Sequence, residues 1–194
     1  MKVLFFDTET NGKPVDYKAP ATKLDNWPRI IQLGWIFDDD GVVSETQSLI
    51  QPDGWEIPEE DFWINHGYST EKNDELGSPM PEVLEAFCND LSKADIIVAH
   101  NMAFDYPVTA AEMIRYDMAP EKENRLKICT MESSTNYCKL HGKYRNWKWP
   151  NLTELNQKLF KEGFDGAHDA LSDVRACARC FYELVKIGVI KINK

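Results

Sequence analysis

The chain has 194 residues, of which 43% are hydrophobic and 28% charged, and this predicts one soluble domain over residues 1–194. Its net charge of −10 argues against a protein that coats nucleic acid by bulk electrostatics, but not against an enzyme with one local binding groove. The sequence has no run of roughly 20 apolar residues and no N-terminal pattern typical of a secretion signal, so we expect a cytoplasmic protein without a membrane partner.

The first third of the chain predicts three strands in an antiparallel meander. An apolar run over residues 2–6 is typical of a buried central strand, and a polar turn follows it. Residues 13–28 contain three prolines and predict an irregular loop. Segments 29–37 and 42–50 then predict two strands joined by a tight turn. For residues 51–78 we expect short helical turns at most.

The rest of the chain alternates helices and short strands. Together with the meander, this pattern predicts an α/β fold, a mixed five-stranded sheet with helices on both faces. The expected elements are a helix over 81–91, a strand over 95–99, a helix to about 116, a strand over 127–129, a helix over 131–139, a helix from 151 and a last helix over 169–186.

Two acidic residues lie at the end of the first predicted strand. Residues two apart in a strand point to the same face, so Asp7 and Glu9 project together. Two carboxylates so close repel each other unless a cation lies between them. The pair therefore indicates either a metal site or an exposed acidic strand end.

Two further polar clusters begin helices. Asn101 and Asp105 follow the strand over 95–99, and alone they are compatible with a helix cap and a favourable acid in the first turn. His168 and Asp173 begin the last helix, where the five-residue offset lets both side chains reach one site. Alone, this pair is also compatible with a capping cluster.

Taken in order, the three segments resemble the exonuclease motifs of the DnaQ-like DEDDh family of 3′→5′ exonucleases. Motif one corresponds to Asp7-Thr8-Glu9, motif two to Asn101-x-x-Phe104-Asp105 and motif three to His168-x-x-x-x-Asp173. The resemblance spans residues 3 to about 185, and the histidine selects the histidine branch of the family over its tyrosine branch. It implies an RNase H-like sheet in the order 3-2-1-4-5, with strand 2 antiparallel.

The resemblance also implies the chemistry of a two-metal phosphodiesterase. Two divalent ions, Mg²⁺ or Mn²⁺, are expected about 4 Å apart, clamping the attacking and leaving oxygens. Asp7 is expected to bridge both ions, Glu9 and Asp173 to complete the site that holds the attacking water, and Asp105 to support the second ion. His168 is expected to be the general base, and the products to be nucleoside 5′-monophosphates.

Four residues are expected near the terminal nucleotide of the substrate. The resemblance places the backbone around Thr8 and Thr10 beside this nucleotide. His66 precedes a glycine in the loop that approaches the substrate in many family members, and the alternative is a histidine that packs the loop. Asn101 is expected either to contact the terminal sugar or only to cap its helix.

Two segments have open roles. The loop over 13–28 directly follows motif one and could border the active site. Residues 139–149 are rich in basic and aromatic side chains, which indicates either contacts with a nucleic-acid strand or a solvated surface loop.

The substrate class and the partners are also open. We expect single-stranded DNA or RNA 3′ ends, with DNA favoured and an RNA-trimming exoribonuclease as the alternative, because two-metal chemistry does not require the 2′-hydroxyl. An inactive nucleic-acid-binding module on the same fold is disfavoured, because all five catalytic positions are filled. An RNase H-like endonuclease is disfavoured by His168 in motif three and by the Asn-x-x-Phe-Asp segment of motif two. A stand-alone enzyme and a proofreading or repair subunit beside a DNA polymerase remain equally compatible with the sequence.

Overall fold

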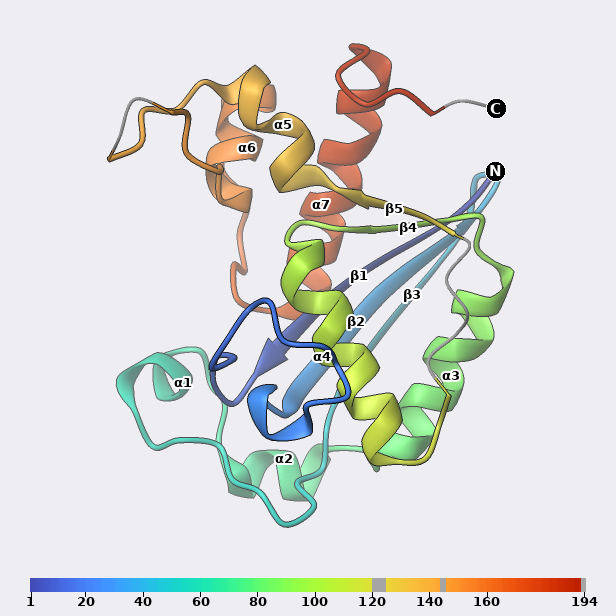
Figure 1. Cartoon of the computed structure of the whole chain (residues 1–194), viewed down its shortest axis with the longest axis vertical. Coiled ribbons are helices and arrows are strands. Elements are labelled where there is room, and N and C mark those ends of the chain that lie inside the picture. Colours follow the sequence, from blue (N-terminus) through green and yellow to red (C-terminus); the bar gives the residue numbers. More distant parts are fainter. Residues whose placement is uncertain (120–124, 144–145, 193–194) are drawn as a thin grey trace.

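The computed structural model describes residues 1–119, 125–143 and 146–192 and contains a five-stranded mixed sheet in the order β3-β2-β1-β4-β5 (Figure 1). The central strand β1 pairs antiparallel with β2 and parallel with β4, and β2–β3 and β4–β5 extend the sheet on either side. The predicted order and the antiparallel second strand are thus confirmed. The strands are β1 (Lys2–Thr10), β2 (Ile30–Asp39), β3 (Val42–Leu49), β4 (Ile96–Ala99) and β5 (Leu126–Cys129).

The helices expected after residue 80 are present, and each helix boundary that the sequence predicted lies within two residues of the observed one. Residues 51–78, where at most short helical turns were expected, contain two short α-helices, α1 and α2. A single 3-10 turn, η1, lies in the proline-bearing loop. A capping box formed by Asn151 and Glu154 begins α6. In the described part of the chain, no helix is both long and apolar enough to cross a bilayer. The helical elements are η1 (Leu24–Asn26), α1 (Asp61–Asn65), α2 (Thr70–Leu76), α3 (Met80–Lys93), α4 (Met102–Arg115), α5 (Thr130–Cys138), α6 (Leu152–Phe160) and α7 (Ala170–Lys186).

The first strand is longer than the sequence predicts. The stretch that we expected to be a polar turn after residue 6 continues as strand to Thr10. It does so because its backbone keeps pairing with β2, where Asp7 lies opposite Gly34 and Glu9 lies opposite Gln32. The acidic pair therefore belongs to the sheet itself, and its side-chain directions are fixed by the pleat.

Successive side chains of β1 enter two separate hydrophobic cores. Leu4 and Phe6 pack with residues of α3 and α4, whereas Val3 and Phe5 pack with residues of α5, α6 and α7. The helices thus cover both faces of the sheet, as predicted, with α4 and α7 on opposite faces (Figure 1). By the same alternation, the side chain of Asp7 points to the α7 face.

The beginning of α7 lies unusually close to the sheet. Asp169 caps the helix by accepting a hydrogen bond from the Ser172 amide. A Cβ atom at Gly34 would lie 2.8 Å from the carbonyl carbon of Ala170, so only glycine permits this approach. Because Gly34 lies opposite Asp7, the contact brings the start of α7 next to the acidic end of β1. The apolar stripe of α7 is buried and consists of Ala170, Val174, Cys177, Phe181 and Leu184.

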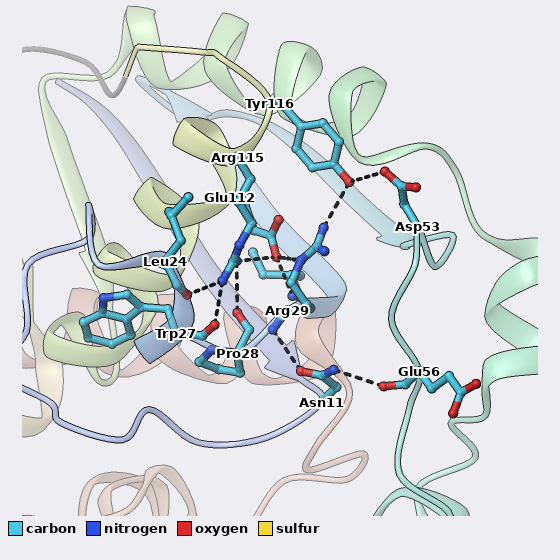
Figure 2. Close-up of polar contacts among 11 residues, drawn as sticks. Asn11, Leu24, Trp27, Pro28, Arg29, Asp53, Glu56, Glu112, Arg115 and Tyr116 are labelled. Carbon is cyan, nitrogen blue, oxygen red and sulfur yellow. Dashed lines mark hydrogen bonds and ion pairs between the residues drawn. The ribbon is translucent and has the colours of Figure 1, made fainter.

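An ion-pair network fastens the proline-bearing loop to the end of α4 (Figure 2). The carboxylate of Glu112 is fully buried and pairs with Arg29 Nε at 2.8 Å and Arg115 Nη1 at 3.0 Å. The Nη2 group of Arg115 also donates to the carbonyl oxygens of Leu24 and Trp27, at 2.7 and 2.6 Å. The loop between β1 and β2 is therefore anchored at its C-terminal end to the helix that begins with motif two.

Candidate active site

The first two candidate ligands extend from the end of β1 toward α7. Asp7 and Glu9 are both partly buried, and they lie on the strand face that also carries Val3 and Phe5. Thr8, between them, points to the opposite face and is buried. The sheet thus presents two carboxylates on one side and a hydroxyl on the other.

The third candidate ligand, Asp105, reaches the same strand end from α4. Its Oδ1 atom accepts hydrogen bonds from the Thr8 amide at 3.1 Å and the Thr8 hydroxyl at 2.8 Å. Asp105 is only 2% exposed and lies in the first turn of α4, as predicted. The two bonds fix this carboxylate next to Asp7, so motifs one and two meet as the sequence predicted.

The remaining candidates come from the start of α7. One ligand atom each of Glu9, His168 and Asp173 lie within 4.8 Å of one another, a spacing that one cation could bridge. The backbone amide of His168 donates to Asp173 Oδ2 at 3.3 Å. The other oxygen of this carboxylate, Oδ1, is buried and has no hydrogen-bond partner among the described residues. All five predicted catalytic residues therefore converge on one end of β1.

Burial and mutual repulsion raise the pKa of every carboxyl in the cluster. Burial raises the pKa of Asp7 well above its usual value, and the charges of Asp105, Asp173 and Glu9 add to the effect. For Glu9, burial and then the charge of Asp173 raise the pKa to about 8. The pKa of Asp173 rises to about 6 and that of Asp105 to about 7, mainly through burial, although the hydrogen bonds from Thr8 oppose the rise at Asp105. Ionisation of all four carboxyls is energetically unfavourable unless a cation compensates their charge.

These residues fit divalent metal ions. Carboxylate oxygens are the ligands that hard cations such as Mg²⁺ and Mn²⁺ prefer. The unpartnered Oδ1 atom of Asp173 is a buried acceptor that an ion could satisfy. An ion at this position would also remove the repulsion that raises the carboxyl pKa values.

A pocket of about 650 Å³ opens beside the cluster. Three of the four predicted substrate-binding residues, Thr8, Thr10 and Asn101, are among its lining residues. Asn101 occupies the N-cap position of α4 but makes no capping hydrogen bond with its side chain, so the amide is available to the pocket. The loop over 13–28 also borders the pocket, through Lys13 and Tyr17.

The fourth predicted residue, His66, does not line this pocket and instead lies beside His168, the candidate base. The ring centroids of His66 and His168 are 4.6 Å apart, and Phe62 from α1 packs at 5.4 Å from the His168 ring. Burial, together with the neighbouring His66, lowers the pKa of His168 below its usual 6.5. The imidazole is therefore neutral at pH 7 and able to accept a proton.

The sequence did not identify several aromatic residues of the pocket wall. Phe62 and Trp63 come from α1, Phe104 from α4 and Tyr17 from the loop before β2. Phe104 belongs to motif two but was not expected to line the site. The short α1 has no periodic pattern that would have signalled this role.

The basic and aromatic segment over 139–149 is only partly described, because residues 144 and 145 lie outside the described ranges. Within the described part, Trp147 and Trp149 are 40% and 63% exposed. Lys148 forms an ion pair with Glu154 of α6. The described residues of the segment do not line the pocket beside the acidic cluster, and a role of the segment in strand binding stays a prediction.

Comparison with solved structures finds the same fold in exonuclease I. The chain superposes on E. coli exonuclease I in complex with a dT13 oligonucleotide with a TM-score of 0.71 and 21% identity, covering 95% of this chain and 41% of that chain. For exonuclease I from Methylocaldum szegediense the TM-score is 0.72 at 18% identity, and the match covers 96% of this chain and 41% of that protein. For a zinc-bound complex of E. coli exonuclease I with single-stranded DNA the TM-score is 0.71 at 19% identity, and the match covers 96% of this chain and 41% of that protein. The chain thus spans about 41% of the length of these proteins.

The family is settled by sequence. No curated protein matches the chain in a direct sequence comparison. A family model described as exonuclease, of the RNase T type, nevertheless matches residues 4–181, which include every residue of the acidic cluster and His168. With three motifs meeting at one strand end on the expected fold, the chain belongs to the exonuclease family, the DnaQ-like 3′→5′ exonucleases.

Proposed function

We propose that the protein hydrolyses single-stranded DNA stepwise from the 3′ end and releases nucleoside 5′-monophosphates. The observation that carries the proposal is the convergence of four carboxylates and His168 beside an open pocket of about 650 Å³. A pocket of this size is within the range that holds small organic ligands such as a nucleotide.

Asp7, Glu9, Asp105 and Asp173 would hold two divalent ions, Mg²⁺ or Mn²⁺. When bound, such ions lower the pKa of a water molecule and neutralise charge on the scissile phosphate. The charges of Asp105, Asp173 and Glu9 all raise the pKa of Asp7, which indicates a central position among the four acids. This position supports a role of Asp7 as the bridging ligand. The hydrogen bonds from Thr8 orient Asp105 toward this group.

His168 would take the proton of the attacking water. One nitrogen of its imidazole lies within 4.8 Å of carboxylate oxygens of Glu9 and Asp173, the residues expected to hold the water's ion. Its lowered pKa keeps the ring in the neutral form that a base requires. We expect the loss of such a base to lower the rate by about 10²–10⁴-fold.

Single-stranded ends fit the aromatic lining of the pocket. Unpaired bases stack on aromatic side chains, and Tyr17, Phe62 and Phe104 offer such surfaces. The preference for DNA rests on the fold shared with exonuclease I, which was solved with dT13 and dA16 oligonucleotides. Because hydrolysis at the phosphate does not require the 2′-hydroxyl, RNA must be tested in parallel.

The test is digestion of 5′-labelled oligonucleotides with Mg²⁺ or Mn²⁺. We expect single-stranded DNA to give a ladder that shortens by one nucleotide at a time, and Asp7→Asn to abolish it. Asp25→Asn, which changes an exposed aspartate in the loop before β2, is the matched control and should leave the ladder unchanged. Purely internal cuts, or faster digestion of RNA than of DNA, would contradict the proposal. A role in proofreading beside a polymerase predicts that a mismatched primer end is removed faster than a matched end.

A further inference from the structure

The backbone around His168 adopts a conformation that is unfavourable by itself. His168 has a φ angle of +70°, and Gly166, two residues earlier, has +80°. For a residue with a Cβ atom, the left-handed region costs roughly 1–2 kcal/mol. Phe62 and His66 pack beside the His168 ring and partly desolvate it, but the residue as a whole is exposed, so packing of the ring alone does little to enforce this conformation. Contacts from elsewhere in the fold must stabilise it.

The described hydrogen bonds to His168 involve its backbone. Its carbonyl oxygen accepts a hydrogen bond from the hydroxyl of Tyr68 at 2.9 Å. This tyrosine follows α1 in the chain and is only 4% exposed. The same hydroxyl lies 2.7 Å from Oε1 of Gln32, which is also buried. The single hydroxyl hydrogen is therefore shared between two acceptors, one on β2 and one on His168.

Gln32 holds the two residues that follow His168. Its Oε1 atom accepts a hydrogen bond from the Ala170 amide at 2.8 Å, and its Nε2 atom lies 3.3 Å from Asp169 Oδ1. Because Oε1 faces a donor and Nε2 faces an acceptor, the orientation of the amide group is determined by its neighbours. Three consecutive residues, 168 to 170, are thus tied to the Tyr68–Gln32 pair.

We propose that Tyr68 is a positioning residue for His168, acting with Gln32 through the backbone of the segment before α7. The inference rests on the proposed function, in which His168 is the base. Tyr68 itself is directed at the carbonyl of His168, and so it acts on the reaction through the histidine. A displacement of about 1 Å can cost roughly 10²-fold in rate, so even a small relaxation of this segment matters.

The experiment is a double-mutant cycle with Tyr68→Phe and His168→Ala. The first variant removes one oxygen atom and keeps the buried ring. Steady-state rates are measured on a single-stranded oligonucleotide at saturating Mn²⁺. We expect Tyr68→Phe to lower kcat by about 10- to 100-fold with KM within about twofold. In the His168→Ala background, the same substitution should change kcat less than twofold, because there is no base left to position.

Tyr182→Phe is the matched control. Its hydroxyl donates to Asp38 at the far end of β2, so the variant also loses one tyrosine hydrogen bond, but away from the site. It should leave kcat within twofold of the unmodified protein. Melting temperatures of all variants show whether a loss of kcat reflects unfolding.

Amide hydrogen exchange supplies a readout that does not depend on activity. In Tyr68→Phe, the amides of residues 166–170 should exchange faster, while those in the second half of α7 should be unchanged. Unchanged exchange in that segment, or an equal loss of kcat in both backgrounds, would overturn the inference while leaving the exonuclease assignment intact. If His168→Ala had no effect on kcat, the role of the base and the inference would fail together.

Discussion

Replacing Glu9 by glutamine should stabilise the metal-free protein while destroying its activity. In the absence of metal, Glu9 is held next to other acids, and burial followed by the charge of Asp173 raises its pKa to about 8. A carboxyl with a raised pKa in the folded state keeps its proton longer than in the unfolded chain. Its contribution to stability is present below the unfolded value and is lost as the pH rises toward 8.

The magnitude follows from the same shift. With a pKa that rises from 4.5 to about 8, Glu9 costs the folded state up to roughly 4 kcal/mol at pH 8, but less than about 1 kcal/mol at pH 5. Glutamine has nearly the same shape and carries no charge, so Glu9→Gln should recover much of this energy. For a chain of this size, about 2–4 °C per kcal/mol predicts an increase in Tm of up to roughly 10 °C at pH 8.

The assay is thermal unfolding in EDTA at pH 5 and pH 8, followed by circular dichroism. Glu9→Gln should raise Tm much more at pH 8 than at pH 5, and added Mn²⁺ should stabilise it less than the unmodified protein. The exposed Glu59→Gln is the control and should show no such difference between the two pH values. An equal shift of Tm at both pH values, or no shift at pH 8, would contradict a Glu9 pKa raised by burial and by the neighbouring acids.

Three further predictions concern other parts of the site. Gly34→Ala would place a Cβ atom 2.8 Å from the Ala170 carbonyl carbon, so it should displace the start of α7. We expect kcat, measured on the oligonucleotide ladder, to fall by about 10- to 100-fold. An unchanged kcat would contradict the close approach of α7 to β2. Glu112→Ala should lower the free energy of unfolding in urea by about 3–5 kcal/mol, because it leaves two arginines without their buried partner. A loss of under about 1 kcal/mol would contradict this expectation. Tyr17→Ala should raise KM about 5- to 10-fold, which corresponds to roughly 1 kcal/mol of base stacking. Val15→Ala, which changes an exposed residue of the same loop, should leave KM unchanged. An equal effect of the two substitutions would exclude base stacking on Tyr17.

The sequence could predict that the five candidate catalytic residues meet at one place, because each lies at the end of a regular element. A strand end fixes the direction of Asp7 and Glu9, and a helix start fixes the directions of Asp105 and Asp173. Once the elements are known, the sheet order brings these ends together. The one error in this region, the polar turn expected after residue 6, arose because pairing with β2 overrides the local preference of polar residues for a turn.

The residues that hold and surround the site could not be predicted in the same way. Tyr68 and Gln32 lie far from the motifs in sequence, and Tyr17 lies in the irregular loop that follows motif one. Each reaches the site only through a contact across the fold. Gln32 looked like an ordinary polar residue in a strand, and Tyr17 lies in a loop without periodicity. Such contacts depend on the tertiary path of the chain, which composition and spacing do not specify.

The most direct test of the two-metal site is anomalous diffraction from a crystal of the protein grown with Mn²⁺ and a nucleoside 5′-monophosphate. We expect two anomalous peaks at the end of β1, with Asp7 in contact with both, and the phosphate beside them. A single peak, or peaks bound only by residues outside the group Asp7, Glu9, Asp105 and Asp173, would contradict it.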